Sequence, residues 1–334
     1  MKKARGFTLL EMAIVVAIIV VTALIMTPIF GKYLTALARN HAEQARIDNQ
    51  RIADSMLAVA QNEGNGILPA PYAGPGNPNA IANPADNSAI GIAFRQALSE
   101  SGLIPTAIND DGTSAKNARV YQRVTGLTQS MPLYFRSGPL VSMTYDYGVI
   151  YATRCPESDS SCRGSGRPGA SPSLTAANRQ SWAVVQPDLA PVFVSTLPVQ
   201  KSMLATTTRR VDRVRDALLS YYRGKQLSAA ATDTTNWFPG SGYGGANPAS
   251  HQGCRDGWYE LDSTNVLPLI GLSQGEFGRT SWGGRIEYCR DYDPAASKGA
   301  NAPPHAAAIR FRSDVSQGAA PDAAVLGNNV ILTL

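Results

Sequence analysis

One apolar segment near the N-terminus constrains this chain more than any other feature of its sequence. Residues 7–30 read FTLLEMAIVVAIIVVTALIMTPIF and contain a single ionisable side chain, Glu11. About 20 consecutive apolar residues are enough to cross a bilayer as an α-helix. Lys2, Lys3 and Arg5 precede the segment, and basic residues stay on the cytoplasmic side of a membrane. The sequence therefore disfavours a soluble cytoplasmic enzyme and predicts a membrane-inserted chain whose remaining residues are extracytoplasmic.

The end of the apolar segment indicates which kind of membrane signal the segment is. A secretory signal peptide ends in a small-residue cleavage site such as A-x-A, and residues 26–30 read MTPIF instead. An uncleaved signal anchor is one alternative. Glu11 favours another, because an ionisable residue inside a membrane segment is costly and normally has a partner. A free amine made by cleavage before Phe7, on this chain or on a neighbour, would supply that partner.

The residues around this position resemble a known leader. Residues 2–6 (KKARG) followed by residues 7–11 (FTLLE) are similar to the class III leader of type IV prepilins and type II secretion pseudopilins. The resemblance implies that a prepilin peptidase and methyltransferase cuts after Gly6 and methylates the new N-terminal Phe7. It also implies that the Glu11 carboxylate meets a neighbouring subunit's amine during assembly. A glycine suits the cleavage site, because it lets a protease approach the backbone closely.

Pro28 agrees with this resemblance, since type IV pilins carry a proline at the corresponding place. A proline deep in a helix removes one hydrogen bond and clashes with the preceding turn, so we expect a kink or local melting there. A proline tolerated near a helix end is the alternative. Apolar residues then continue at helical spacing to about residues 63–66 (EGNG), where two glycines should end the helix. We predict a cleaved leader at 1–6 and one helix over 7–66, with a transmembrane and assembly half at 7–30.

The remaining residues predict an α+β fold in which the long helix carries a head rich in antiparallel β-structure. Proline-rich residues 68–87 are typical of a surface loop, and a second long helix is expected to begin at Ser202. Shorter elements are expected as a helix at 88–102 and as strands at 118–124, 131–135 and 141–153. A similar order of elements on both sides of residues 187–198 suggests two tandem pilin-like modules, at 67–190 and 198–334.

The chain has four cysteines, two in each proposed module. An even number in an extracytoplasmic chain favours disulfides and allows three pairings. We expect Cys155 to pair with Cys162 and Cys254 to pair with Cys289, the second closing a long loop worth about 3–4 kcal/mol. Zinc is the competing use, because His251 lies close to Cys254. The spacing lacks a second close pair of ligands, which disfavours zinc.

Residues 277–288 (FGRTSWGGRIEY) resemble the D-P-W-G-x-P-Y-x-Y stretch of major pseudopilins. Thr280 and Ser281 stand where that family has Asp-Pro, which puts in doubt any calcium site carried over from it. Asp291 and Asp293 could contribute oxygens, but a hard cation takes six or more. We interpret both as solvated loop carboxylates and expect no metal and no cofactor.

Two surface features could bind a ligand, and each has a simpler interpretation. The basic run at residues 209–216 (RRVDRVRD) includes two aspartates, which favours a salt-bridged solvated face over nucleic-acid binding. Residues 237–259 are rich in aromatic side chains, which we interpret as core. The net charge of +5 is largely leader, because removing residues 1–6 leaves 27 basic against 25 acidic side chains. Nucleic acid is therefore disfavoured as a partner.

These observations predict a structural protein and not an enzyme, since the sequence has no nucleophile, metalloprotease or phosphate-loop motif. We expect a minor type IV pilin, which joins other pilin subunits through an N-terminal helix bundle and displays a head that could be adhesive for an unspecified surface ligand. It would lie in the inner membrane before assembly and then in an extracellular pilus. One alternative is a pseudopilin in a periplasmic pseudopilus of a type II secretion system. Another is an uncleaved membrane-anchored extracytoplasmic binding protein.

Overall fold

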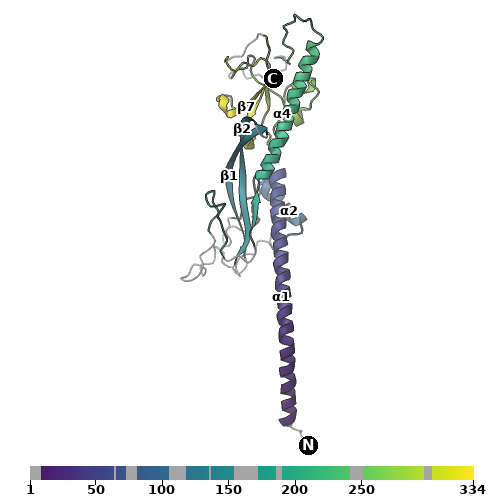
Figure 1. Ribbon diagram of the computed structural model, residues 1–334, viewed down its shortest axis with the longest axis vertical. Helices are drawn as coiled ribbons and strands as arrows, with labels where there is room; N and C mark the ends of the chain where they lie inside the picture. The colour runs from purple at the N-terminus through teal and green to yellow at the C-terminus, as the bar shows by residue number, and fades with distance from the viewer. Residues whose placement is uncertain are drawn as a thin grey trace.

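The protein is an α+β molecule in which a long N-terminal helix projects from an elongated head (Figure 1). The computed structural model describes residues 9–63, 65–72, 81–104, 118–134, 137–153, 172–185, 190–240, 251–296 and 303–334. The side chains of residues 9–11, 19, 23–29, 38, 41, 118, 152 and 153 lie outside this description. The N-terminal end of the helix lies far from the head, and the C-terminus lies within it.

Helix α1 (Leu9–Asn62) is a single helix of 54 residues. The helix is continuous through Pro28, without local melting, and the kink and the assembly role of this proline stay predictions. A proline removes only one hydrogen bond, and the helical ladder continues on both sides of it. The helix ends close to the predicted glycines, where the Gly66 N–H donates to the carbonyl of Ala60. Gly66 has a φ of 83°, a left-handed conformation that glycine adopts without a steric penalty.

The first sheet has three antiparallel strands in the order β1 (Ala118–Tyr134), β2 (Ser137–Thr153) and β3 (Val192–Ser195). The sequence predicted two strands within the span of β1. The structure has one long strand instead, because a bulge near Gly126, whose φ is 73°, absorbs the irregularity without ending the ladder. Helix α2 (Ala89–Glu100) packs beside α1 and begins as predicted, with the Ser88 hydroxyl accepting from the Gly91 N–H.

Helix α4 (Leu197–Gln226) begins before the predicted Ser202, with Pro198 in its first turn, where a missing N–H costs nothing. The second sheet follows it and is also antiparallel, in the order β4-β5-β6-β7. Its strands are β4 (Tyr259–Glu260), β5 (Glu287–Cys289), β6 (Ala308–Arg312) and β7 (Asn329–Thr333). Four short helices lie in the connections between these strands: α5 (Val266–Leu269), α6 (Gln274–Phe277), η3 (Val315–Gln317) and η4 (Leu326–Asn328).

Two large hydrophobic clusters fill the head. The first joins the end of α1 to α2 and the first sheet, and includes Met56, Phe94 and Tyr121. The second joins α4 to the second sheet, and also includes Leu133 and Met143 from the far end of the β1–β2 hairpin. The hairpin therefore contributes to both clusters. The division into modules at 67–190 and 198–334 stays a prediction.

The aromatic stretch interpreted as core is largely buried in the described residues. Phe238 and Tyr259 belong to the second large cluster. Trp258 packs in a smaller one beside Cys254 and Tyr292. Trp237 is partly exposed, and Tyr243 lies outside the described residues.

Candidate functional site: the projecting helix and its attachment to the head

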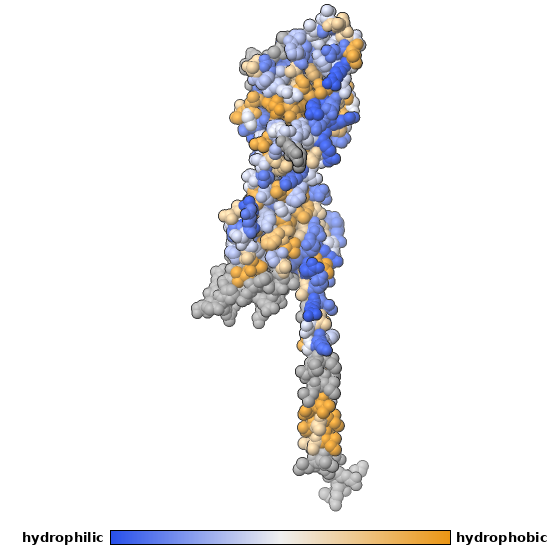
Figure 2. All heavy atoms as spheres, in the orientation of Figure 1, coloured by the Kyte–Doolittle hydropathy of each residue, from blue (hydrophilic) through white to orange (hydrophobic). Residues whose placement is uncertain are grey.

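Helix α1 has two halves with different surroundings. We define the projecting half as residues 9–44 and the packed half as residues 45–62. Large apolar side chains of the projecting half are exposed, among them Met12, Ile14, Val15, Val16, Ile18, Val20 and Val21. Because successive helical residues point about 100° apart, these side chains surround the helix, and Figure 2 shows them as an apolar band beyond a hydrophilic stretch. Exposed apolar surface of this extent marks a contact with a membrane or another protein.

Two of the four residues predicted for processing and assembly lie in this half. Gly6 and Phe7 are outside the described residues. Glu11 and Pro28 lie on α1, and the positions of their side chains are outside the description. Within the part of the chain that the structure describes, no helix combines the length and the apolar character needed to cross a membrane. The membrane-spanning role of residues 7–30 therefore stays a prediction.

The packed half is built into the first hydrophobic cluster. Ile52, Met56 and Ala60 are fully buried, on the side of α1 that faces α2 and the first sheet. Their spacing of four residues places them in one row along the helix. The head therefore holds the last turns of α1 by burial of apolar surface.

One buried glutamine joins the end of α1 to both parts of the head. The Gln200 amide, in the second turn of α4, donates to the Asn65 carbonyl at 3.1 Å. Its oxygen accepts from the Trp282 indole N–H at 2.7 Å and lies 3.3 Å from the Ser316 hydroxyl. Gly66 lies so close that a Cβ there would collide with the Gln200 amide. Gln200 therefore fixes the turn after α1 against α4 and against two loops of the second sheet.

A second attachment fixes the segment that follows. The Asp146 carboxylate on β2 accepts from the Leu68 N–H at 3.0 Å, and the Tyr121 hydroxyl donates to the Pro69 carbonyl at 3.0 Å. Arg123 donates to the Leu68 carbonyl and lies 3.8 Å from Asp146. Burial raises the pKa of Asp146, opposed by the Leu68 N–H and the Arg123 cation. The first sheet thus holds the chain as it leaves α1.

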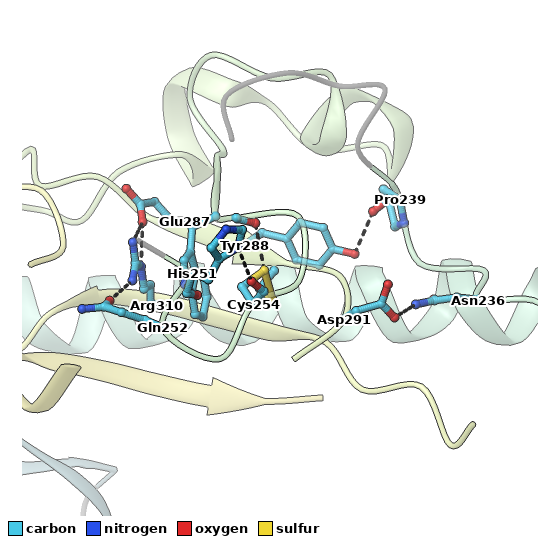
Figure 3. Close-up of a disulfide and its surroundings, with 12 residues drawn as sticks. Asn236, Pro239, His251, Gln252, Cys254, Glu287, Tyr288, Asp291 and Arg310 are labelled. Atoms are coloured by element: carbon cyan, nitrogen blue, oxygen red, sulfur yellow. Dashed lines mark hydrogen bonds and ion pairs between the residues drawn. A yellow bond between two sulfur atoms is a disulfide. The ribbon is translucent and has the colours of Figure 1, made fainter. Parts of the chain in front are cut away.

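The second sheet contains the predicted disulfide between Cys254 and Cys289, with a Cα–Cα distance of 5.8 Å (Figure 3). Cys155 and Cys162, the other expected pair, lie outside the described residues. Because Cys254 is bonded to Cys289, it is not available as the zinc ligand considered beside His251. No group of three or more metal-ligating side chains converges among the described residues.

Beside the disulfide, Arg310 on β6 forms a buried ion pair with Glu287, at 2.7 Å. Arg310 also donates to Gln252 and lies over the Trp258 ring, 4.3 Å from its centroid. Burial raises the pKa of Glu287 and lowers that of Arg310, in each case opposed by the other partner's charge. Gln252 and Trp258 hold Arg310 in position beside Glu287. Loss of either member of the pair would leave the other as an unpaired buried charge.

Asp291 corrects an expectation from the sequence. It is buried and not a solvated loop carboxylate: its Oδ1 accepts from the Asn236 amide at 2.5 Å and lies 3.3 Å from the His305 ring (Figure 3 shows the amide contact). The Tyr288 hydroxyl donates to the Pro239 carbonyl nearby, at 3.2 Å. These contacts fasten residues 236–239 to the second sheet. The Asp291 carboxylate therefore has a structural role.

The basic run on α4 is partly neutralised within the helix, as the sequence indicated. Arg215 forms ion pairs with Asp212 at 3.2 Å and with Asp216 at 3.3 Å. Arg210 donates to the carbonyl of Arg279 and so contacts the second sheet's loops. The positive charges on this face of α4 are therefore partly neutralised by aspartates of the same helix.

A comparison with protein-family models identifies the start of the chain. The model described as the prokaryotic N-terminal methylation motif matches residues 1–27. The chain carries the class III leader of a type IV pilin or pseudopilin. This pilin-type motif points to a structural protein, to processing by a prepilin peptidase and to assembly with other pilin subunits. No curated protein and no solved structure matches the chain.

Sequence reasoning missed the residues that attach α1 to the head. Gln200 carried one usable signal, because it lies in register with Leu204, Thr207 and Val211 on the buried side of α4. A polar residue at a core position needs a hydrogen-bonding partner. Its partners, Asn65 and Trp282, are far away in the sequence, so no local pattern could identify them.

Proposed function

We propose that this protein is a minor subunit of a type IV pilus, assembled through α1 and displaying its head outside the cell. The observation that carries the proposal is the combination of a pilin-type leader at residues 1–27 with a helix that exposes apolar side chains all round between Met12 and Val21. The other half of the same helix is part of the head's core. Helix α1 would therefore link the segment that assembles, its projecting half, rigidly to the head that is displayed.

The proposed mechanism begins in the inner membrane, where residues 7–30 hold the precursor. Prepilin peptidase cuts after Gly6, and Phe7 is methylated. The Glu11 carboxylate, which is costly to keep unpaired in an apolar environment, then meets the N-terminal amine of a neighbouring subunit. As the subunit leaves the membrane, its apolar side chains exchange lipid contacts for contacts with other helices, so little apolar surface becomes exposed to water.

The head would be the part that meets the surroundings of the cell, and we propose that it contributes to surface contact and adhesion. Its disulfide suits an oxidising extracytoplasmic location. The buried pair of Glu287 and Arg310, and the loop contacts around Asp291, hold it in one shape. A head of this construction would keep its form outside the cell.

The second candidate is a pseudopilin of a type II secretion system. Residues 277–288 favour it through their resemblance to major pseudopilins, and Trp282 of this stretch is buried against Gln200. Leader cleavage, methylation and the role of Glu11 would be the same in both candidates. The assembly that the subunit joins would be a secretion pseudopilus instead of a pilus.

The experiment that separates the two is deletion of the gene in its own bacterium, scored for pilus number, twitching and release of secreted proteins. The pilus proposal predicts fewer pili or weaker adhesion and twitching, with normal secretion. It also predicts the wild-type protein in the filament fraction sheared from the cells. Loss of secretion with normal piliation would reject the pilus in favour of the secretion pseudopilus.

A further inference from the structure

A groove of about 250 Å³ lies between the C-terminal ends of α1 and α2. Three alanines (Ala58, Ala93 and Ala97) line it together with Val59, Asn62 and Gln96, and two carboxylates, Glu63 and Glu100, stand beside them. The Gln96 amide donates to the Glu100 carboxylate at 2.9 Å, which leaves the charge of Glu100 without a cation. We call this surface the acidic groove. Small residues allow another helix to approach closely, so the groove has a shape that a second helix can enter.

The charge of the acidic groove is unbalanced within the described residues. Glu63 and Glu100 are exposed, and no described lysine or arginine lies within ion-pair distance of either. Each lies at the C-terminal end of its helix, and neither helix has a basic residue in its last turn. The helix dipole adds negative charge at this end and favours cations there. A cation from outside the molecule would therefore be attracted to the groove.

The projecting half of α1 carries a surface of complementary character. Gly31, Thr35 and Ala36 form a shallow small-residue face, and Lys32 and Arg39 stand on it, seven residues apart and on the same side. We call this surface the basic stem face. All five residues are exposed, and no described carboxylate lies within ion-pair distance of the two cations. This face matches the acidic groove in both side-chain size and charge.

The two surfaces cannot meet within one molecule, because both lie on the rigid helix α1 at different heights. Residues 35 and 60 are separated by about 37 Å along the axis, at a rise of about 1.5 Å per residue. A neighbouring copy with its helix parallel to the first, and shifted by that distance toward the head, brings the two surfaces together. The match therefore defines both the orientation and the stagger of the second copy.

We propose that a second copy of this chain docks its basic stem face into the acidic groove, with parallel α1 helices staggered by about 37 Å. Lys32 and Arg39 of one copy then face Glu63 and Glu100 of the other. The inference rests on the proposed function, because filament assembly is what makes neighbouring helices parallel. It adds a contact between a stem and a head to the contacts among the apolar segments.

Cysteine cross-linking between two full-length copies tests the contact. One copy carries Ala36→Cys, the other carries Ala97→Cys, and both are expressed in the same cells. We expect a disulfide-linked dimer, in membranes and in sheared filaments, that requires both substitutions. The control pairs Ala36→Cys with Ala205→Cys, an exposed position on α4, and should give no dimer. Ala58→Cys, which is exposed, replaces Ala97→Cys if the latter lowers thermal stability.

Charge reversal shows whether the carboxylates carry the contact. Glu100→Arg in one copy should lower the cross-linked fraction about fivefold, as expected for an exposed ion pair. Arg39→Glu in the other copy should restore it. Asp54→Arg, an exposed change on α1 outside the groove, should leave the fraction unchanged.

The outcomes separate this contact from the proposed function. Absence of the dimer from both fractions, or a dimer of equal yield with the Ala205→Cys control, would overturn the docking even if the wild-type protein is in filaments. Failure of Arg39→Glu to restore cross-linking would overturn the proposed pairing of charges. Absence of the wild-type protein from sheared filaments, with the dimer still present in membranes, would reject the filament and retain the docking.

Discussion

The projecting and packed halves of α1 belong to one continuous helix, yet their apolar side chains meet opposite surroundings. Ile18 in the projecting half is 60% exposed, whereas Ile52 in the packed half is 0% exposed. Both are isoleucines on a helix, so local propensity cannot explain the difference. Helix α2 and the first sheet cover Ile52. Within one helix, the packed half therefore stabilises the head, and the projecting half leaves its apolar side chains available for contact with a partner.

If this division is right, substitutions in the two halves should have separable effects. Changes in the projecting half should alter incorporation into filaments and leave the stability of the head unchanged. Changes in the packed half, or in the head, should alter the free energy of unfolding and leave leader processing unchanged. Four experiments test this separation.

The largest effect is expected from Glu11→Ala. Without the carboxylate, the amine of a neighbouring subunit would stay unpaired in an apolar environment, so the amount of subunit in sheared filaments should fall at least about tenfold. Its amount in the membrane should not change. Glu43→Ala is the control, because Glu43 is an exposed residue paired with Arg46 on the same helix. Normal incorporation of the Glu11→Ala subunit would contradict the proposed role of this carboxylate.

Arg310→Met should lower the free energy of unfolding by about 3–5 kcal/mol, because it leaves Glu287 buried without its cation. Urea denaturation measures this loss, and leader cleavage should be unaffected. In the variant the pKa of Glu287 should rise further above its ordinary 4.5, so the native state binds a proton that the unfolded state releases. The stability deficit relative to wild type should therefore shrink as the pH is lowered from 7 toward 5.

The control for this pH dependence is the double substitution Arg310→Met with Glu287→Gln. It has no carboxylate at position 287, so its deficit relative to wild type should not change over the same pH range. A deficit of the single variant that grows on acidification would contradict the assignment of the effect to Glu287.

Ile52→Ala and Ile18→Ala compare the two halves directly. Truncation of the buried Ile52 should cost about 2–5 kcal/mol of unfolding free energy, because it removes apolar contacts and leaves a cavity. Truncation of the exposed Ile18 should change it by less than about 0.5 kcal/mol. Denaturation of both purified variants in detergent provides the measurement. Similar losses for the two substitutions would contradict the assignment of different roles to the two halves of α1.

Trp282→Phe should have the smallest effect, about 1 kcal/mol, by removing the indole N–H that donates to Gln200. The Ser316 hydroxyl remains near the same oxygen, which limits the loss. The substitution separates the attachment of α1 from the helix itself, because it loosens that attachment without changing a residue of α1. Thermal denaturation measures it, and Trp237→Phe, a partly exposed tryptophan, is the matched control.

Much of this fold follows from local patterns in the sequence. The end of α1, the position of α2 and the antiparallel character of the sheets depend on helical spacing, glycines and β-branched residues close together in the chain. The pairing of Cys254 with Cys289 was one of three possibilities, and the structure contains it. The bulge near Gly126 was not predicted, because glycines predict breaks as readily as they permit an irregular ladder.

The attachment of α1 to the head could not be predicted in the same way. Gln200 and Trp282 are 82 residues apart, and Asp146 and Leu68 are 78 apart. Such contacts depend on the arrangement of complete elements in space. Asp291 illustrates the same limit, because its burial depends on Asn236 and His305, which local polarity does not reveal.

The most direct test of this account is the intact mass of the wild-type protein purified from bacterial membranes. We predict a chain that begins at Phe7, carries one added methyl group and lacks residues 1–6. Peptide mapping without reduction of the same sample should yield Cys254 linked to Cys289. A full-length chain that keeps Met1 to Gly6, or one cut at another position without methylation, would contradict the central claim that α1 is the processed assembly helix of a pilin-like subunit.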